Sequence, residues 1–321
     1  MGDIERIVEG VYPAAALLAG MQLDLFTPLG ERPYGAGELA KLLHVQQEQL
    51  ETLLYALAAA GLLCVCDGRF ANGEEADRRL VRGRSGFVGD KHLMWSHCFA
   101  AALQTAESVR SGRPAAQVDF SARDDSELAE LLGGLHPGAK NVGRELAALL
   151  DIAERAEVLD VGGGSGGVAL GILEGCPGIA VTVAELPEVV ALTRRFIAGE
   201  GQAERVQVIE CDLCEESPVG AFDMAVLKAF VQVLAVDMAK RALVHVYQAL
   251  APGGCVVIYG DMVDDSRVEP PEMALFSLFF LSAYESGRAY TESEYRLWLQ
   301  EAGFVRVEAL EQGVLLAHKE G

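Results

Sequence analysis

The sequence predicts an α/β protein with a doubly wound, mainly parallel sheet in its C-terminal half and a helical N-terminal part before it. From about residue 158, short apolar runs alternate with amphipathic helical segments, which is the pattern of parallel strands joined by crossover helices. A glycine-rich loop at residues 162–167 directly follows the first apolar run, as in Rossmann-like sheets. Residues 1 to about 110 instead carry apolar residues at helical spacing.

In the N-terminal part, helices are expected where apolar residues recur every three or four positions. They cover residues 12–24, 37–43 and 46–60, and Gly61 ends the last one. A strand pair is expected at 62–66 and 69–71, on either side of the turn at Asp67 and Gly68. Two helices followed by a two-stranded wing form the winged-helix pattern, which often binds DNA. The second helix carries Glu48 and Glu51 and no basic residue, so a structural wing is the better interpretation.

In the C-terminal part, the parallel strands are expected at residues 158–161, 179–184, 206–210, 224–227 and 255–259. The helices are expected to run through Leu173 and over residues 188–198, 240–250 and 292–302, and a hairpin is expected at 305–310 and 313–318. Residues 87–150 are expected to add helices whose apolar face suits a pocket wall or a dimer interface, with Met94, Trp95, Phe99 and Leu103 on it. These patterns divide the chain into residues 1–110, 111–150 and 151–321.

Length and charge limit the class of protein. The 321 residues exceed the usual size of one hydrophobic core, so more than one domain is expected. The formal net charge of −21 repels a phosphate backbone, so nucleic acid is not an expected partner. The chain opens without the basic segment of a signal peptide. The longest apolar run, residues 273–283, is too short to span a membrane and is expected to be a buried helix or a pocket wall. We therefore expect a cytoplasmic protein that does not insert into a membrane.

Seven cysteines are present, an odd number that argues against a complete disulfide framework. Two close pairs, Cys64 with Cys66 and Cys211 with Cys214, have spacings that also occur in metal sites. Neither pair lies near a histidine in the sequence. We therefore interpret them as structural thiols and predict no metal.

The glycine loop satisfies a nucleotide-binding spacing. Gly162, Gly164 and Gly167 form the pattern G-x-G-x-x-G, and Glu185 follows about 20 residues later at the end of the second strand. Glycine lets a backbone approach a ligand closely, and an acid at that strand end accepts hydrogen bonds from ribose hydroxyls. By spacing alone the loop fits NAD as well as other adenosine cofactors.

Two further acids favour a cationic cofactor. Asp160 lies in the strand just before the loop, where it would repel a pyrophosphate and attract the cationic amino-acid part of a ligand. Asp212 ends the third strand, where it suits an adenine amino group.

Several motifs together resemble one family. They are the loop D-V-G-G-G-S-G from Asp160, the run Glu185-Leu186-Pro187, Asp212, the pair Phe222-Asp223 and the run Ala251-Pro252-Gly253-Gly254. They resemble the class I methyltransferases and, more narrowly, the dimeric O-methyltransferases of plant phenolics and bacterial polyketides. The resemblance covers nearly the whole chain, since that family has an N-terminal winged-helix dimerisation domain. It implies S-adenosylmethionine as the cofactor, a homodimer, and a hydrophobic small-molecule substrate.

The resemblance also implies cofactor contacts. Gly162 is expected at the methionine part, Glu185 at the ribose, and Asp212 and Leu213 on either side of the adenine. Lys228 matches a cofactor-contacting cation of the family, although an exposed cation at a strand end explains it equally well. The complete expected set is Asp160, Gly162, Gly164, Glu185, Leu186, Asp212, Leu213 and Lys228.

The family's general base does not carry over. Its histidine falls on Gln232, and the two carboxylates that support it fall near Asp261 and on Ala289. Glutamine only hydrogen-bonds near neutral pH. Methyl transfer to carbon, nitrogen or an acidic oxygen is therefore expected, because the sulfonium methyl is already electrophilic. Gln232 either orients the acceptor or is a satisfied polar residue of the pocket floor.

His136 is the expected replacement base or substrate contact, because it precedes the helix that lines the family's substrate cavity; a solvated loop histidine is the alternative. The expected pocket wall is aromatic and apolar, although core packing explains any single member: Met273, Phe276, Phe280 and Tyr284. Two other functions stay open, a cofactor-binding enzyme with a non-methylating reaction and a cofactor-sensing winged-helix regulator.

Overall fold

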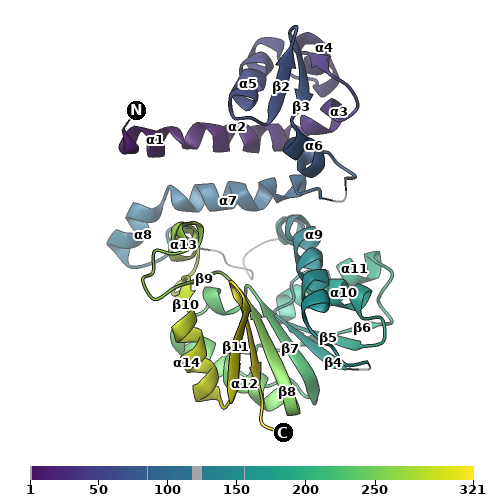
Figure 1. Ribbon diagram of the computed structural model, residues 1–321, viewed down its shortest axis with the longest axis vertical. Helices are drawn as coiled ribbons and strands as arrows, with labels where there is room; N and C mark the ends of the chain where they lie inside the picture. The colour runs from purple at the N-terminus through teal and green to yellow at the C-terminus, as the bar shows by residue number, and fades with distance from the viewer. Residues whose placement is uncertain (1, 85, 118–124, 155) are drawn as a thin grey trace. The chain divides into compact units, whose positions relative to one another are not determined.

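The computed structural model describes residues 2–84, 86–117, 125–154 and 156–321 (Figure 1). It divides into two compact units, Met1–His97 and Cys98–Gly321. Of the expected connector 111–150, residues 118–124 lie outside the described part of the chain. No helix among the described residues is both long enough and apolar enough to cross a lipid bilayer.

The first unit combines short helices with a three-stranded antiparallel sheet of order β1-β3-β2. The helices and the β2–β3 hairpin predicted from periodicity are present; β1 was not predicted, because two residues are too few to show an alternation. Its elements are α1 (Asp3–Glu9), α2 (Val11–Gln22), α3 (Phe26–Leu29), β1 (Tyr34–Gly35), α4 (Ala36–Leu43), α5 (Gln47–Ala59), β2 (Leu63–Cys66), β3 (Arg69–Asn72), α6 (Glu74–Leu80), η1 (Gly89–Lys91) and the start of α7 (His92–Ala102).

The helical spacing of leucines in α5 builds the core of this unit. Leu50, Leu54 and Leu57 lie on one face of the helix and are buried. They belong to one apolar cluster with Phe26 of α3 and Phe70 of β3. The short sheet is therefore held by side-chain burial as well as by its backbone hydrogen bonds.

The second unit is built on a seven-stranded sheet of order β11-β12-β8-β7-β4-β5-β6, in which β12 runs antiparallel to both of its neighbours, β11 and β8, and the other pairs are parallel. The predicted α/β class with a mainly parallel sheet is confirmed. Its elements are the end of α7, α8 (Thr105–Ser111), α9 (Asp125–Leu149), β4 (Glu157–Val161), α10 (Gly167–Gly175), β5 (Ala180–Glu185), α11 (Pro187–Gly199), β6 (Val206–Glu210), β7 (Phe222–Lys228), η2 (Val231–Val233), α12 (Val236–Ala249), β8 (Leu250–Tyr259), β9 (Met262–Val263), α13 (Pro271–Ala283), β10 (Tyr290–Thr291), α14 (Glu292–Ala302), β11 (Arg306–Glu311) and β12 (Val314–His318).

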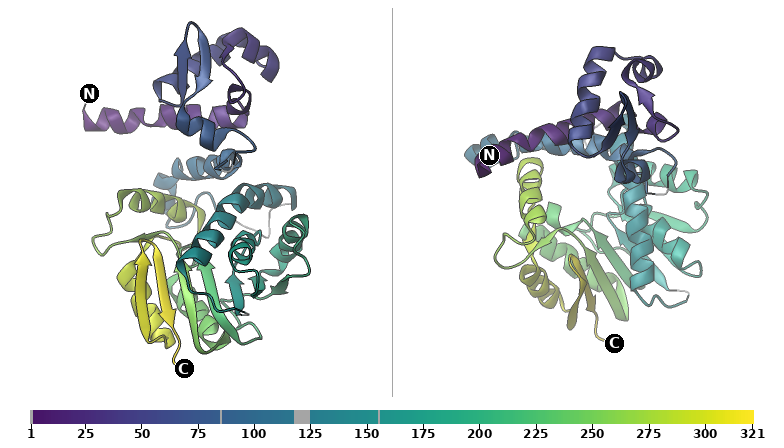
Figure 2. Two further views of the ribbon diagram at one scale, coloured as in Figure 1. Left: turned by 45° about the vertical axis from the view of Figure 1, so that its right-hand side comes forward. Right: turned by 45° about the horizontal axis from the view of Figure 1, so that its top comes forward.

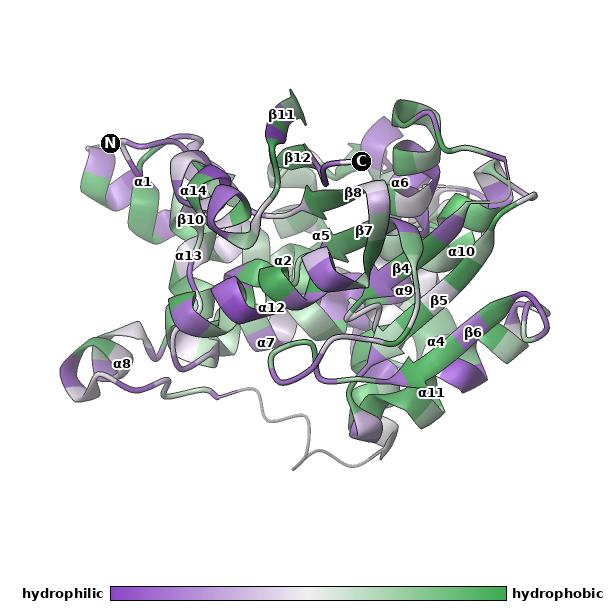
Figure 3. Cartoon of the chain, turned by 90° about the horizontal axis from the view of Figure 1, so that it is seen from below, coloured by the Kyte–Doolittle hydropathy of each residue, from purple (hydrophilic) through white to green (hydrophobic). Residues whose placement is uncertain are grey.

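Both faces of the central strands are apolar, so helices cover both sides (Figures 2 and 3). Side chains alternate between two clusters along each strand. In β4, Val158 packs in the cluster with α9 and α10, and Leu159 packs in the cluster with α12 and α14. Met224 and Ala225 divide in the same way in β7. The carboxyl edge of the sheet, where the strands end, is left for the functional groups.

One expectation from the sequence is wrong, and the burial of another segment is uneven. His136 does not precede a helix, because α9 continues through Pro137. Proline removes one helical hydrogen bond, but α9 packs so closely on α10 that a Cβ added to Gly167 would lie 2.7 Å from the Ala139 Cβ. The apolar run 273–283 is not buried throughout: Leu275 of α13 is 67% exposed, while Phe280 is buried. The apolar composition of α13 therefore does not show which of its faces is buried.

Candidate active site

Three acidic side chains lie at the carboxyl ends of neighbouring parallel strands. Asp160 is the last residue but one of β4, Glu185 is the last residue of β5, and Asp212 follows β6. The three strands are adjacent in the sheet, and the strand order reverses between β4 and β7. Ligands of such sheets bind at the carboxyl edge beside this reversal. The sheet thus gathers the acids predicted for the cofactor at one edge.

The glycine loop between β4 and α10 depends on a backbone conformation that other residues rarely adopt. Gly162, Gly164 and Gly166 have φ angles of 61°, 56° and 72°. A Cβ added to Gly162 would lie 2.7 Å from the Phe230 ring. Phe230 therefore packs directly on the loop. The sequence interpretation missed this residue, although it lies two positions beyond β7 at the same sheet edge.

Asp160 is a buried carboxylate, 1% exposed, below the loop. Its Oδ2 accepts a hydrogen bond from the Ala169 amide at 3.1 Å, and its Oδ1 has no partner among the described residues. Burial, with the nearby charge of Glu185, raises the pKa of Asp160 to about 7, against the opposing effects of the Ala169 amide and Lys228. An unpartnered buried oxygen of this kind fits a cationic group of a ligand.

Glu185 is also buried and is held by the backbone. Its Oε1 accepts from the Gly164 amide at 2.9 Å and its Oε2 accepts from the Leu186 amide at 2.7 Å. Burial raises the pKa of Glu185 despite these two donors. Leu186 itself is half-buried at the start of α11. The glycine loop and this carboxylate therefore form one unit.

The two residues predicted for the adenine, Asp212 and Leu213, follow the end of β6. The Asp212 Oδ1 accepts from the Cys214 amide at 2.9 Å and so fixes a turn. Leu213 is buried in the apolar cluster between the sheet and α12. His245 of α12 contacts the Leu213 carbonyl oxygen at 2.8 Å.

A second polar group follows β7 and β8. Gln232 of η2 is 2% exposed, and its Nε2 donates to the Asp261 Oδ2 at 3.2 Å. The Gln232 Oε1 and the Tyr295 hydroxyl are buried and have no partner among the described residues. A Cβ added to Gly260 would lie within 4 Å of both oxygens, so they border the same small space. Burial raises the pKa of Asp261 and of Asp160, and the charge of Lys228, at the end of β7, opposes this rise for both carboxyl groups. Lys228 therefore acts on the Gln232–Asp261 pair and on the cofactor edge of the sheet.

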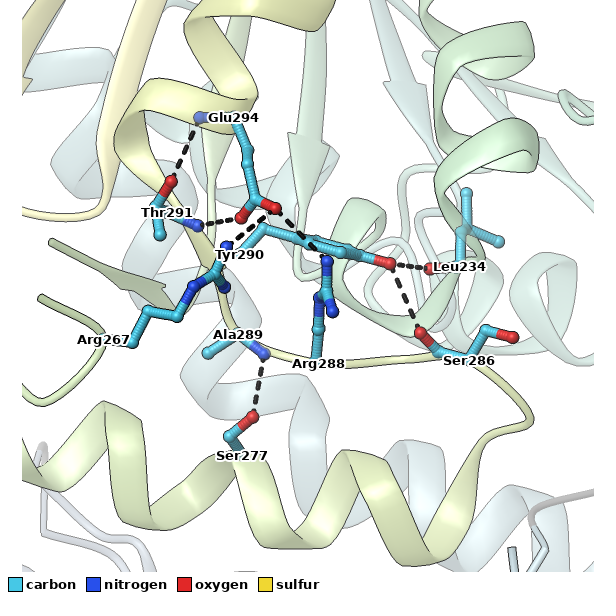
Figure 4. Close-up of polar contacts among 9 residues, drawn as sticks. All are labelled: Leu234, Arg267, Ser277, Ser286, Arg288, Ala289, Tyr290, Thr291 and Glu294. Atoms are coloured by element: carbon cyan, nitrogen blue, oxygen red, sulfur yellow. Dashed lines mark hydrogen bonds and ion pairs between the residues drawn. The ribbon is translucent and has the colours of Figure 1, made fainter. Parts of the chain in front are cut away.

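A short segment, residues 286–291, supports the turn that carries Gln232 (Figure 4). The Arg288 amide donates to the Gln232 carbonyl oxygen at 2.9 Å. The Tyr290 hydroxyl donates to the Leu234 carbonyl oxygen at 2.6 Å, two residues further along. The position of Gln232 is therefore fixed by backbone contacts that no local sequence pattern reveals.

The same segment is tied to α13 and α14 (Figure 4). The Ala289 amide donates to the Ser277 hydroxyl of α13 at 3.1 Å. Glu294 of α14 accepts from the guanidinium groups of Arg267 at 3.0 Å and of Arg288 at 3.2 Å. Ala289 supplies its backbone amide to this contact.

The predicted substrate wall lies on α13. Phe276 and Phe280 pack edge to face at 5.3 Å, and Phe280 lies 6.3 Å from Tyr284, measured between ring centroids. Phe279 stacks on Phe276 at 5.5 Å. Met273 lies on the same helix and is half-buried. The aromatic side chains thus form one cluster whose end at Tyr284 adjoins the segment that supports Gln232.

His136 is not brought together with Gln232. Its Nδ1 lies 2.8 Å from the Ser165 hydroxyl of the glycine loop, and its ring stacks on Phe196 at 5.4 Å. Its Nε2 faces Glu200 at 3.6 Å. Burial lowers the pKa of His136, against the opposing effect of Glu200. These contacts place the His136 side chain against the glycine loop and α11.

Thiols and metals play no visible part in this arrangement. Cys64 and Cys66 are exposed on β2, whereas Cys211 and Cys214 are buried. Burial raises the pKa of Cys211 to about 11 and that of Cys214 to about 12. No cluster of His, Cys, Asp and Glu side chains among the described residues has the composition of a metal site.

Comparison with known proteins identifies the family. The profile of the O-methyltransferase domain matches residues 104–305. The chain belongs to the O-methyltransferase family. Across 312 residues it is 30% identical to the tetracenomycin polyketide synthesis 8-O-methyl transferase TcmO of Streptomyces glaucescens, with 95% of this chain and 92% of that enzyme covered. It is 31% identical to the acetylserotonin O-methyltransferase of Mus musculus molossinus, with 94% and 83% covered.

Solved structures agree on the fold of this O-methyltransferase. PigF with SAH superposes with a TM-score of 0.87 at 23% identity, covering 100% of both chains. Human N-acetylserotonin methyltransferase in complex with SAM superposes with a TM-score of 0.86 at 22% identity, covering 100% of this chain and 99% of that one. The resemblance inferred from the sequence motifs is confirmed, and the protein is a methyltransferase.

Proposed function

We propose that this O-methyltransferase transfers the methyl group of S-adenosylmethionine to a hydroxyl group of a hydrophobic, aromatic small molecule, without a histidine base. The observation that carries the proposal is the buried Gln232, which Gly287 joins to Tyr284 at the end of the aromatic cluster of α13 and which the motif resemblance matches to the family's catalytic histidine. Oxygen is favoured over carbon or nitrogen as the acceptor atom because both relatives are named for O-methylation.

The methyl donor is S-adenosylmethionine, and the residues present fit it. Asp160, with one unpartnered oxygen, offers a counter-charge to the cationic amino-acid part. Glu185, at the carboxyl end of β5, is suited to accept hydrogen bonds from the ribose hydroxyls, and Phe230 packs on the glycine loop. When bound, the cofactor supplies an electrophilic methyl group, so the protein contributes mainly alignment and exclusion of water.

The acceptor is held by the second group of residues. The α13 aromatic residues, with Phe276 and Phe280 at their centre, suit a flat, apolar ring system. The names of two relatives point to the same chemistry, since one acts in tetracenomycin polyketide synthesis and another on 3-hydroxy-5-methyl-1-naphthoate. The unpartnered Gln232 Oε1 can accept a hydrogen bond from the acceptor.

We also propose that each part of the chain has the role expected from the sequence. Residues 1–110 serve dimerisation through a winged-helix-like domain, residues 111–150 contribute a pocket wall, and residues 151–321 bind the cofactor. The homodimer and the cytoplasmic location remain predictions.

Thermal unfolding with S-adenosylmethionine, S-adenosylhomocysteine or NAD tests the cofactor assignment. A ligand at 100 times its dissociation constant stabilises by roughly 2.7 kcal/mol. We expect both sulfur cofactors to raise the Tm of the wild type and to raise that of Glu185→Ala much less. Glu204→Ala, which removes an exposed carboxylate in the turn after α11, is the matched control and should respond as the wild type does. Stabilisation by NAD alone would refute the assignment.

A further inference from the structure

We propose that Asp261 is the proton acceptor of the methyl transfer and that Gln232 orients its carboxylate. This inference depends on the proposed function, because it concerns the same acceptor hydroxyl. It goes beyond the family's chemistry, in which a histidine takes the proton and carboxylates only support it.

Gln232 is placed to fix the orientation of the Asp261 carboxylate. The Gln232 side chain is 2% exposed, and its Nε2 donates to the Asp261 Oδ2 at 3.2 Å. An amide nitrogen donates and cannot accept, so the carboxylate must be the acceptor in this contact. The amide oxygen of Gln232 has no partner among the described residues, so the contact with Asp261 is the one that fixes this amide. Asp261, in contrast to Gln232, is only half-buried.

No histidine described in the second unit competes for this role. His136 contacts Ser165 behind the glycine loop, and His245 contacts the Leu213 carbonyl. His318 pairs with Cys255 in the middle of β8, whereas Asp261 follows the carboxyl end of that strand. Of the side chains that contact Gln232, Asp261 is the carboxylate with proton-accepting capacity.

Burial and the neighbouring groups act on the pKa of Asp261 in opposite directions. The titratable groups that face it among the described residues are Lys228 of β7, Tyr259 of β8 and Tyr295 of α14. Burial raises the pKa of Asp261, while Lys228 and the hydrogen bond from Gln232 lower it. A carboxylate whose pKa is raised by burial is a stronger base than an exposed one.

The step balances without a further reactant. The hydroxyl oxygen of the acceptor forms a bond to the methyl carbon, and the carbon–sulfur bond of the cofactor breaks with its electron pair going to sulfur. The hydroxyl proton passes to a carboxylate oxygen of Asp261. The products are the methyl ether, S-adenosylhomocysteine and a protonated Asp261, which returns its proton to water.

The test compares acceptors of different acidity. Wild type, Asp261→Asn and Asp261→Glu are assayed for S-adenosylhomocysteine release with S-adenosylmethionine and a series of substituted 2-naphthols. The series runs from a hydroxyl pKa near that of tyrosine, about 10, to one already ionised at the assay pH. We expect Asp261→Asn to lose roughly 10²- to 10⁴-fold in kcat for the weakest acid and only a few-fold for the ionised acceptor. Asp261→Glu should retain part of the rate for the weak acid.

The controls separate a proton acceptor from a structural residue. Asp151→Asn removes an exposed carboxylate and should match the wild type with every naphthol. Stabilisation of each variant by S-adenosylhomocysteine verifies the fold. Equal losses for weak and ionised acceptors, or no loss for either, would overturn the role of Asp261. A wild type that binds the cofactor but methylates no naphthol would overturn the proposed substrate class, and the inference with it.

Discussion

At the residue scale, the site is governed by carboxylates that the fold places in apolar surroundings. Asp160 is 1% exposed, and one of its oxygens has no partner among the described residues. Burying such a group raises the free energy of its charged form. The buried charge of Asp160 therefore lowers the folding stability of the protein, and a bound cationic ligand offsets this loss.

This cost predicts a pH dependence. The pKa of Asp160 rises from its ordinary value of 3.8 to about 7, so the folded chain retains a proton that the unfolded chain releases between these values. The stability from this group is present below about pH 4 and is lost as the pH rises to about 7. We expect Asp160→Asn, which stays neutral, to gain in unfolding free energy relative to the wild type between pH 4 and pH 8. The gain is on the order of 4 kcal/mol.

Urea unfolding of both proteins at several pH values measures this difference. Because other titrating groups contribute equally to both chains, their effects cancel. A difference that stays constant across the pH range would show that the neighbouring Glu185 and Lys228 compensate for the burial of Asp160.

At the scale of elements, the acceptor side is built from contacts between segments far apart in the chain. The segment 286–291 lies against η2 so closely that a Cβ on Gly287 would be 2.8 Å from the Gln232 carbonyl oxygen. The same Cβ would lie 3.1 Å from the Tyr284 Cβ, at the end of the aromatic cluster. One glycine thus sets the spacing between the aromatic wall and Gln232.

Gly287→Ala is expected to shift η2 and lower kcat by about 10- to 100-fold, since displacement by about 1 Å can cost 10²-fold. Binding of S-adenosylhomocysteine should be unchanged, because the glycine loop is elsewhere on the sheet edge. Gly199→Ala is the matched control: a Cβ there meets nothing within 4 Å, and its kcat should equal that of the wild type. Steady-state kinetics with a naphthol acceptor checks both. Loss of cofactor binding in Gly287→Ala would contradict this local role.

At the scale of the whole molecule, the first unit carries an apolar face without a partner in the described chain. Ile4, Ile7, Val8, Val11 and Tyr12, on α1 and the start of α2, are each more than half exposed. Contiguous exposure of this kind usually marks an interface. It supports the homodimer that we propose.

Ile7→Glu combined with Tyr12→Glu should weaken self-association. Burial of each such side chain contributes roughly 1.5–3 kcal/mol, so the dimer dissociation constant should rise at least about 100-fold. Light scattering at several concentrations measures the mass. Val219→Glu, at a residue that is 97% exposed in the loop before β7, is the control and should leave the mass unchanged. A double variant with the wild-type mass would show that this face is not the interface.

Local patterns were sufficient for the cofactor side of the site. The strand before the glycine loop, the loop itself and the acids at successive strand ends are each encoded within a few residues, and parallel strands bring their carboxyl ends to one edge. Asp160, Glu185 and Asp212 were therefore placed correctly at that edge. Leu213 was not predicted to be buried in the core, because its neighbour α12 is about 25 residues away in the sequence.

The acceptor side required the tertiary structure. The contacts of Gln232 with Asp261, of Tyr290 with Leu234 and of Phe230 with Gly162 join positions 29, 56 and 68 residues apart, respectively. His136 was expected in a loop, and only the packing of α9 on α10 decided that the helix continues through Pro137. The sequence by itself determined the α/β sheet and the glycine loop, because these follow from short-range periodicity and spacing, and the methyl donor followed from the resemblance of the combined motifs to the methyltransferases. Only the tertiary structure decided which polar groups meet the acceptor, because such contacts depend on how distant elements pack.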